Sequence, residues 1–399
     1  MSGYLMKNNN FCYAPWMHLY TNPDGRLMPC CMFHDNNNEF PDLNLVPIEA
    51  AINHPKMIKL RQELMVGETP AGCFRCDAQA KMNMTPYRTK MNNYGEKQNI
   101  KFNQDGTVNP LEFKPSYLDI RFGNLCNLKC RTCSPTFSSS IAVEFNKMNN
   151  VNFPVLHSLN IGVIDQILSN LDNVEHIYLA GGEPLIEENN YILIKKLIER
   201  NLKPSLLYNT NLTNIKYKDN KLTELWEHFP DVKLTVSLDG YKEVNNYVRF
   251  GSNYDQILEN IMTIKREAPH VTFNINSVAS IMSIHSLPEL GRDILQRGIC
   301  GPEEMVFSIC HHPEIFDPVV LPAKNKEEVL KLFDEYKNWI KDNFGHTIRH
   351  DFLIKKCIGL MDHMMSCDNS GLLPEALIQL GNQDRFRKTD YRTICNFDL

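Results

Sequence analysis

The sequence lacks the features that mark several classes of protein. It has no run of about 18 apolar residues, so no membrane-spanning helix is expected. Its first ten residues contain no apolar signal core. A formal net charge of −5 leaves no basic excess for binding nucleic acid or an acidic membrane surface. Internal repeats are also missing. These absences predict a soluble, cytoplasmic protein with neither nucleic-acid nor membrane partners.

Cysteine, by contrast, is abundant, with 13 residues in a chain of 399. Cytosolic thiols stay reduced, so clustered cysteines are interpreted as metal ligands before disulfides. Cys300, Cys357, Cys367 and Cys395 have no cluster spacing and are expected to be packed thiols. The clustered cysteines all lie in the first third of the chain, at positions 12, 30, 31, 73, 76, 126, 130 and 133.

Three of these cysteines, Cys126, Cys130 and Cys133, directly follow the apolar run Tyr117–Ile120, which is predicted to be a strand. A [4Fe–4S] cluster usually takes four cysteine ligands, so three thiolates leave one iron free. An open coordination position is typical of a metal centre that performs chemistry. The spacing alone also allows a zinc site or three core cysteines.

A second set of cysteines lies nearer the N-terminus. The turn signal Asn22-Pro-Asp-Gly25 predicts a small hairpin that ends at Cys30 and Cys31. The apolar spacing of Ile48–Val66 predicts a helix, which Gly67 would end. Four cysteines of this segment are candidate metal ligands. They also suit a structural zinc knuckle, and Cys31 could replace Cys30. They are Cys12, Cys30, Cys73 and Cys76.

Residues 116–315 alternate predicted strands with amphipathic helices, and this pattern indicates a parallel sheet with ligands at the carboxyl ends of its strands. Six such units suit an α/β fold in the form of a partial (β/α)6 TIM-like barrel. An amphipathic helix over Asn325–Asn343 follows. The predicted strands are Tyr117–Arg121, His176–Ala180, Ser205–Tyr208, Val232–Leu238, Val271–Val278 and Met305–Ile309, and the predicted helices between them include Ile192–Arg200, Tyr254–Lys265 and Leu287–Gln296.

Candidate ligand-binding residues stand at the ends of these strands. Two glycines allow a close backbone approach to a ligand, and a neighbouring carboxylate can accept hydrogen bonds from an ammonium group. An arginine can pair with a carboxylate through two parallel hydrogen bonds. Taken singly, each of these candidate residues could be part of an ordinary turn or simply exposed to solvent. The set is Gly181, Gly182, Glu183, Pro184, Asn209, Ser237, Asp239, Arg249 and Val278.

The cysteine triad followed by Gly-Gly-Glu-Pro after the second strand resembles the radical S-adenosylmethionine (SAM) enzymes. This resemblance implies that SAM binds the free iron of the cluster. It implies that Gly181–Pro184 hold the amino group of SAM and that Arg249 pairs with its carboxylate. Asn209, Ser237 and Asp239 resemble strand-end residues near the SAM ribose and amino-acid portion, and Val278 is placed to line the adenine.

The N-terminal set resembles the twitch domain, a short relative of the SPASM domain. The matching features are the Cys12 to Trp16 segment, Gly25, the Cys30-Cys31 pair, Cys73-x2-Cys76 and Arg88. The resemblance implies a second, auxiliary [4Fe–4S] cluster. In this chain the module precedes the radical SAM core.

The resulting organisation is an auxiliary module at residues 1–95, a linker at 96–115, a radical SAM partial barrel at 116–315 and a helical region at 316–399. The family resemblance implies reductive cleavage of SAM to a 5′-deoxyadenosyl radical, which abstracts hydrogen from a substrate. A peptide substrate is expected, to be crosslinked, epimerised or oxidised, with flavodoxin or ferredoxin as electron donor.

Two other hypotheses stay open. One is a dehydrogenase or epimerase of a small molecule, and the other is a non-catalytic zinc or iron–sulfur protein that binds partners or transfers electrons. The sequence names no catalytic acid or base. Cys310, His311 and His312 follow the last predicted strand, where they could bind metal, contact substrate or simply pack.

Overall fold

The computed structural model describes residues 10–35, 39–81, 85–345 and 348–395. The chain divides into two compact units. The first comprises the described residues up to Leu125, together with Leu156–Tyr208 and Glu227–Asp231. The second comprises Cys126–Val155, Asn209–Trp226 and the described residues from Val232 onward.

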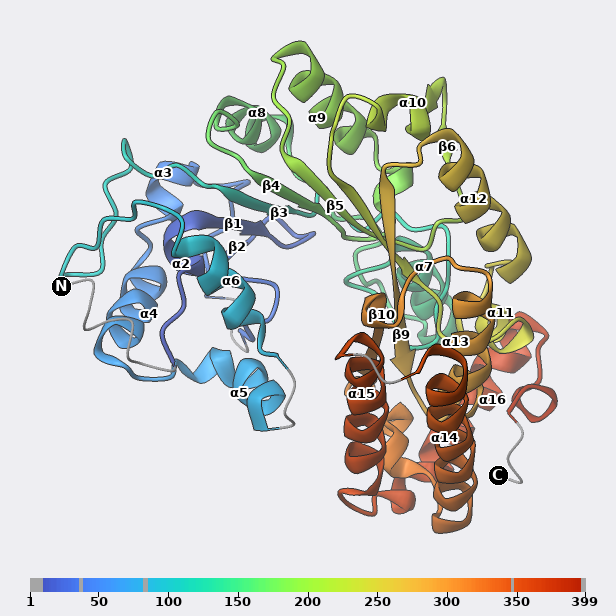
Figure 1. The fold of residues 1–399 in the computed structure, drawn as a ribbon. Coiled ribbons are helices and arrows are strands. Elements are labelled where there is room, and N and C mark those ends of the chain that lie inside the picture. The colour runs from blue at the N-terminus through green and yellow to red at the C-terminus, as the bar shows by residue number, and fades with distance from the viewer. Residues whose placement is uncertain (1–9, 36–38, 82–84, 346–347, 396–399) are drawn as a thin grey trace. The chain divides into compact units, whose positions relative to one another are not determined.

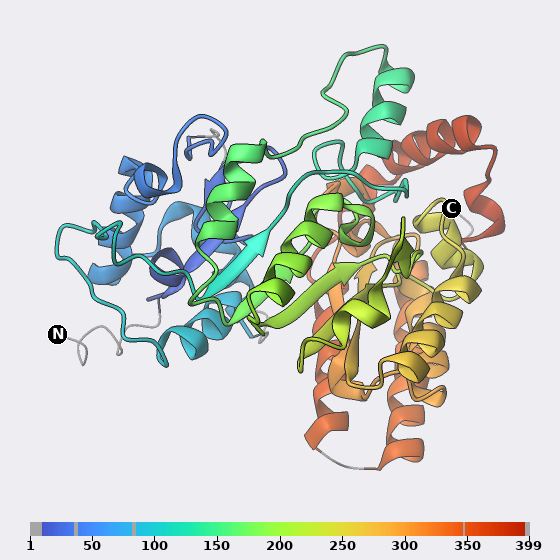
Figure 2. The same cartoon turned by 90° about the horizontal axis from the view of Figure 1, so that it is seen from above.

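The first unit is built on strands in the order β2-β1-β3-β4-β5, of which β2 alone runs antiparallel to its neighbour. The predicted hairpin is present as β1 and β2, with Tyr20 opposite Met28. Helices α8 and α9 lie side by side on one face of these strands (Figure 2). The strands are β1 (His18–Thr21), β2 (Leu27–Met28), β3 (Tyr117–Ile120), β4 (His176–Leu179) and β5 (Ser205–Thr210), whose last two residues belong to the second unit.

The two faces of this sheet differ in chemistry because side chains alternate along a strand. Leu118, Ile177 and Leu206 are neighbours across β3, β4 and β5 and are fully buried. On the other face Asp119 lies between Tyr20 and Tyr178. The first face therefore belongs to the apolar core. The opposite face, called the polar face here, combines Asp119 with Tyr117 and Tyr178, which join the aromatic cluster around Phe11 and Trp16.

The N-terminal helices of this unit pack around an aromatic core that contains Phe11, Tyr13 and Trp16. The single helix predicted over Ile48–Val66 is wrong, because Pro55 starts a new helix, as proline favours a first turn. Gly67 ends this helix with φ +90°, as predicted. The helices are α2 (Ala14–Met17), α3 (Ile48–Ala51), α4 (Pro55–Val66), α5 (Phe74–Lys81), α6 (Tyr87–Gly95), α8 (Ile161–Ser169) and α9 (Glu188–Glu199), with the 3-10 turns η1 (Ala71–Cys73) and η2 (Pro184–Ile186).

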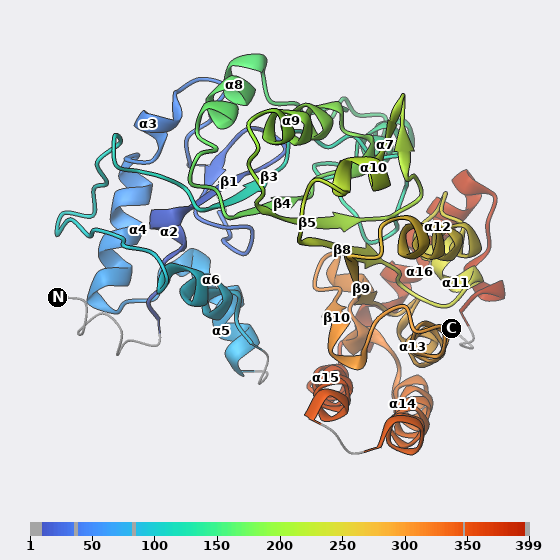
Figure 3. The ribbon, with the colours of Figure 1, turned by 45° about the horizontal axis from the view of Figure 1, so that its top comes forward.

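The second unit has three parallel strands in the order β8-β9-β10. Helix α14 and helix α15 run side by side (Figures 1 and 3), and α15 also packs on β10. The elements are β8 (Val232–Ser237), β9 (Val271–Ala279), β10 (Met305–Ile309), the small pair β6 (Lys216–Tyr217) and β7 (Asn220–Lys221), α7 (Ser139–Asn149), α10 (Leu222–Trp226), α11 (Glu243–Val248), α12 (Tyr254–Glu267), α13 (Leu287–Gln296), α14 (Ala323–Phe344), α15 (Ile348–Met365) and α16 (Leu373–Arg387).

All six predicted strands of the βα pattern are present, and none of their ends differs from the prediction by more than two residues. The three predicted helices between them and the helix predicted over Asn325–Asn343 are also present. The α/β fold class with a helical C-terminal region is therefore confirmed. No helix in the described part of the chain combines the length and the apolar character needed to cross a bilayer.

Candidate functional site

The loop between β3 and α7 carries the cysteine triad, and the first turn of α7 fixes its backbone. The Cys126 amide donates to Ser139 Oγ at 3.2 Å, and Ser140 Oγ donates to the Cys126 carbonyl at 2.6 Å. Ser138 Oγ donates to the Leu128 carbonyl at 3.2 Å. Three consecutive serines thus hold the loop, a role that the cysteine spacing did not reveal.

A second segment, at the end of α11, holds the other side of the loop. The Lys129 amide donates to the Phe250 carbonyl at 2.9 Å, and the Arg131 amide donates to the Val248 carbonyl at 2.8 Å. These two hydrogen bonds flank Cys130 on either side. The same segment contains Arg249, whose charge acts on the Cys130 thiol.

The three thiols of the triad are close enough to influence one another. Burial raises the pKa of Cys133, and the neighbouring Cys130 and Cys126 raise it further. Burial also raises the pKa of Cys130, against the opposing effect of Arg249. Thiols bind metal as thiolates, whose negative charge needs compensation. Three adjacent thiols beside a guanidinium therefore fit the expected three-cysteine cluster.

Arg249 belongs to a buried network at the ends of β8 and β9. Its Nη1 donates to Asp239 Oδ2 at 2.9 Å, while Asp239 Oδ1 accepts from the Val278 amide at 2.8 Å. Burial lowers the pKa of Arg249, but Cys130 and Asp239 outweigh burial and raise it. One edge of the guanidinium is therefore already paired, whereas the buried Nε has no partner.

The remaining strand-end residues of this unit are Asn209 and Ser237. Ser237 ends β8 and is 7% exposed. Asn209 lies near the end of β5, and its buried Oδ1 has no hydrogen-bond partner. Both positions are polar at the carboxyl end of a strand, which is where parallel sheets bind ligands.

Gly181 and Gly182 follow β4 in the first unit. Gly181 has φ +126°, and a Cβ there would lie 2.7 Å from the Gly123 carbonyl oxygen. A Cβ on Gly182 would lie 2.1 Å from the Leu125 carbonyl oxygen. The sequence predicts close approach to a ligand, and the structure shows that both glycines closely approach the backbone directly before the triad.

Glu183 and Pro184 complete this motif. The Glu183 amide donates to the Leu125 carbonyl at 2.7 Å. Its side chain is 2% exposed, and Oε1 accepts from the Leu185 amide at 3.0 Å. Pro184 then starts the 3-10 turn η2. The carboxylate is thus held in one orientation by the turn that follows it.

The N-terminal cysteines come together from four separate places: before α2, after β2, at the end of η1 and in α5. Burial raises the pKa of Cys12 and of Cys73 to about 12, and each is raised further by Cys76. Burial also raises the pKa of Cys30, with further contributions from Cys31, Cys12 and Cys73. Arg88 acts on Cys12 and Cys73 from α6 and pairs with Asp77. The four thiols therefore fit one auxiliary cluster.

Cys30 and Cys31 face different surroundings, which the sequence left undecided. Burial raises the pKa of Cys31 to about 12, and the groups that act on it next are Asp119 and Arg121 rather than the other N-terminal cysteines. Asp119 lies beside the Cys31 thiol, but its oxygens make no hydrogen bond of normal geometry. Cys30 thus joins the four-thiol set, and Cys31 joins the polar face of the sheet.

This polar face contains buried groups that sequence reasoning missed. His18 is 4% exposed, its ring nitrogens make no hydrogen bond of normal geometry, and burial lowers its pKa to about 3 against the opposing effect of the Pro29 backbone. Asp119 is fully buried, burial raises its pKa, and Arg121 Nη2 lies 3.5 Å from its Oδ1. Tyr87 Oη, from α6, lies beside the Cys31 thiol and makes no hydrogen bond of normal geometry. The alternation His-x-Tyr in β1 and Tyr-x-Asp in β3 is the signal that could have revealed this face.

The C-terminal helix α16 also supports the triad, although the sequence assigned it no role. Arg131, between two of the cysteines, is 1% exposed. It donates to Asp384 Oδ1 at 2.6 Å and to Gln383 Oε1 at 3.0 Å, and its guanidinium lies 3.7 Å from the centre of the Tyr247 ring. The loop is therefore anchored to residues about 250 positions later in the chain.

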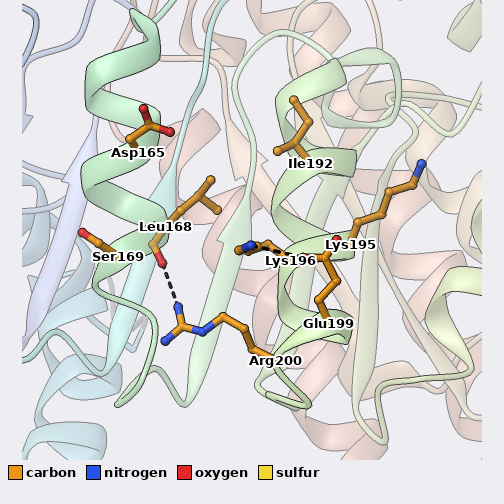
Figure 4. Close-up of a pocket in the computed structure, with 8 residues that line it drawn as sticks. All are labelled: Asp165, Leu168, Ser169, Ile192, Lys195, Lys196, Glu199 and Arg200. Carbon is orange, nitrogen blue, oxygen red and sulfur yellow. Dashed lines mark hydrogen bonds and ion pairs between the residues drawn. The ribbon is translucent and has the colours of Figure 1, made fainter.

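A hollow between α8 and α9 on the helical face of the first unit is a different kind of feature (Figure 4). Arg200 Nη1 donates to the Leu168 carbonyl there at 2.9 Å. Lys195, Lys196 and Glu199 line it from α9. None of the predicted site residues lines this hollow.

Two family models match the chain. Residues 120–278 match the radical SAM superfamily, and residues 12–77 match SPASM, an iron–sulfur cluster-binding domain. An uncharacterised protein of Methanocaldococcus jannaschii is 26% identical over 195 residues, which are 46% of this chain and 59% of that protein.

Solved structures show weaker likenesses. Native anSMEcpe with bound AdoMet (SAM) has a TM-score of 0.41 and 18% identity, over 57% of this chain and 60% of that chain. Streptococcus suis SuiB bound to its precursor peptide SuiA has a TM-score of 0.35 and 14% identity, over 70% and 62% of the two chains. The chain thus matches less than two thirds of the length of each of these proteins and of the M. jannaschii protein.

Proposed function

We propose that this chain, which carries a radical SAM domain preceded by a SPASM-type iron–sulfur domain, is an enzyme that cleaves SAM and abstracts hydrogen from a peptide. The two domains imply a [4Fe–4S] cluster, an auxiliary cluster and SAM. When bound and reduced, these cofactors supply a 5′-deoxyadenosyl radical. The protein's own residues bind the cofactors, orient the substrate and exclude water.

Cys126, Cys130 and Cys133 are the proposed ligands of the first cluster. The loop geometry supports this assignment. Serines at the start of α7 and backbone hydrogen bonds to the segment after α11 fix the positions of the cysteines. Arg249 balances thiolate charge next to Cys130 and keeps its Nε for a ligand. The proposed contacts with SAM are Gly181, Gly182, Glu183, Pro184, Asn209, Ser237, Asp239, Arg249 and Val278.

The auxiliary cluster is assigned to Cys12, Cys30, Cys73 and Cys76, whose thiols influence one another. Cys31 is left out because the charged groups that act most strongly on it are Asp119 and Arg121, although it also acts on Cys30. In this arrangement the auxiliary site adjoins the polar face of the first unit. The cluster there either takes an electron from the substrate or helps to shape the binding site.

The buried polar face is the observation that carries the peptide proposal. A buried polar group whose hydrogen bonds are incomplete costs about 1–3 kcal/mol. His18, Tyr87 and Asp119 make no hydrogen bond of normal geometry, and the ion pair of Asp119 with Arg121 is long at 3.5 Å. This group therefore favours a ligand that completes its hydrogen bonds. A peptide backbone offers donors and acceptors together. Asp119 and the Tyr87 hydroxyl can therefore hold an amide group of the substrate.

The first test is cleavage of SAM. Anaerobically reconstituted protein with dithionite, or with flavodoxin as electron donor, should release 5′-deoxyadenosine. The Cys126/Cys130/Cys133 triple alanine variant should release none. Equal release by this variant, or no release by the wild type with both clusters loaded, contradicts the proposal and favours a non-catalytic iron–sulfur protein.

The second test concerns the substrate, and its probe is a synthetic copy of any short peptide that the neighbouring genes encode. Mass spectrometry should show its modification, and Asp119→Asn should slow that reaction by about tenfold or more while SAM cleavage persists. The matched control Asp172→Asn removes an exposed carboxylate of the same unit. Cleavage of SAM with an unmodified peptide would instead favour the small-molecule alternative.

A further inference from the structure

We propose that His311, Asp317 and His363 form a binding site for one divalent transition-metal ion. The site is built from side chains other than the clustered cysteines and lies in the second unit. Neither matched domain assigns a function to these three residues, because both matches end before residue 279.

The three ligands come from separate elements that the fold brings together. His311 follows β10, Asp317 precedes the 3-10 turn η6 (Pro318–Val320), and His363 lies in the last turn of α15. One ligand atom from each residue lies within 4.8 Å of the others. The packing of α15 on β10 and on η6 therefore creates the group.

The distances suit a single ion. His311 Nδ1 lies 3.1 Å from Asp317 Oδ2, and His363 Nε2 lies 2.8 Å from Asp317 Oδ1. Ligand bonds of about 2.1 Å at 90–110° place neighbouring donor atoms about 3.0–3.4 Å apart. Both histidine–aspartate contacts are close to this spacing, and all three donor atoms lie within 4.8 Å of one another.

The donor set points to the class of metal. Two imidazoles and one carboxylate suit Zn²⁺, Fe²⁺, Co²⁺ or Mn²⁺, and three protein ligands leave at least one position for water or a substrate oxygen. The side chain of His311 is 51% exposed, which gives solvent access, whereas those of Asp317 and His363 are 10% and 12% exposed.

The site lies at the carboxyl edge of the strands of its unit. The Cys310 amide, one residue before His311, donates to the Ala279 carbonyl at the end of β9 at 2.9 Å. Val278, the previous residue, donates to Asp239. The ion would thus sit at the strand edge that carries the Asp239–Arg249 pair, where a ligand on its open position could be a substrate carboxylate or amide oxygen.

A metal-free arrangement of the same residues is the competing explanation. In it each histidine donates its N–H to Asp317, which also caps η6 by accepting from the Val319 amide at 3.1 Å. A metal ion would replace the two imidazole protons at the same nitrogens. The two explanations therefore differ in whether the group takes up an ion.

Zinc is the probe that distinguishes them. Reconstituted holoprotein is passed over chelating resin and titrated with Zn²⁺, and iron and zinc are measured together by mass spectrometry. The wild type should bind one zinc per chain with its iron content unchanged. His311→Gln, at a half-exposed position that tolerates substitution, should weaken zinc binding at least tenfold.

The matched control is His312→Gln, which removes the adjacent exposed imidazole outside the group and should leave zinc binding unchanged. His363→Gln should also lose the zinc. No zinc uptake by the wild type, or equal uptake by all three variants, overturns the proposal in favour of the hydrogen-bonded arrangement. The measurement needs no SAM cleavage, so it stands apart from the proposed function.

Discussion

Asp384→Asn should detach the cysteine loop from helix α16. The Asp384 carboxylate accepts hydrogen bonds from Arg131 Nη2 at 2.6 Å, Thr389 Oγ1 at 2.6 Å, Tyr247 Oη at 3.0 Å and the Tyr391 amide at 2.7 Å. All four partners are donors, so an amide NH₂ group cannot replace the second oxygen. The substitution also leaves the Arg131 charge buried without a counterion.

The size of the effect follows from this burial. Removing one partner of a buried ion pair costs about 3–5 kcal/mol. One kcal/mol changes the Tm of a unit of this size by about 2–4 °C, so the Tm should fall by about 6–20 °C. Circular dichroism at rising temperature measures this change.

The loss of the Arg131–Asp384 ion pair should also disturb cluster binding, because Arg131 lies between Cys130 and Cys133. The iron content after reconstitution should fall from about eight toward about four per chain, because the N-terminal cysteines retain their cluster. Asp390→Asn is the matched control, since solvent screens its exposed pair with Arg392. Wild-type Tm and iron content in Asp384→Asn would refute the reasoning.

Two further predictions concern other parts of the chain. Gly182→Ala should abolish SAM cleavage, because its Cβ would lie 2.1 Å from the Leu125 carbonyl oxygen, whereas Gly371→Ala, where nothing lies within 4 Å, should be neutral. Burial lowers the pKa of His285 to about 4, below its unfolded value near 6.5. The unfolded state therefore binds the proton first, and the free energy of unfolding should fall by about 3 kcal/mol as the pH drops from about 6.5 to 4. Urea titrations at several pH values should show that this free energy depends less steeply on pH in His285→Gln. The same pH dependence in the variant and the wild type would contradict this assignment.

The sequence predicted the strands well because each is a short apolar run bounded by turn residues. Such a run is visible locally in the sequence, and its side chains are buried in the fold. The helix over residues 48–66 was predicted wrongly because its apolar spacing continues across Pro55, which instead begins a second helix. The glycines after β4 were identified, but the sequence could not show that their close neighbour is the backbone of Gly123–Leu125.

The sequence by itself predicted two groups of cysteines and the polar residues at the strand ends, because spacing along the chain carries both signals. Tertiary structure decided that Cys12 and Cys73 come close to Cys30, while Asp119 lies beside Cys31. It also decided that Arg131 pairs with Asp384, 253 positions away. Such contacts depend on packing between distant segments, and no local pattern of residues encodes them.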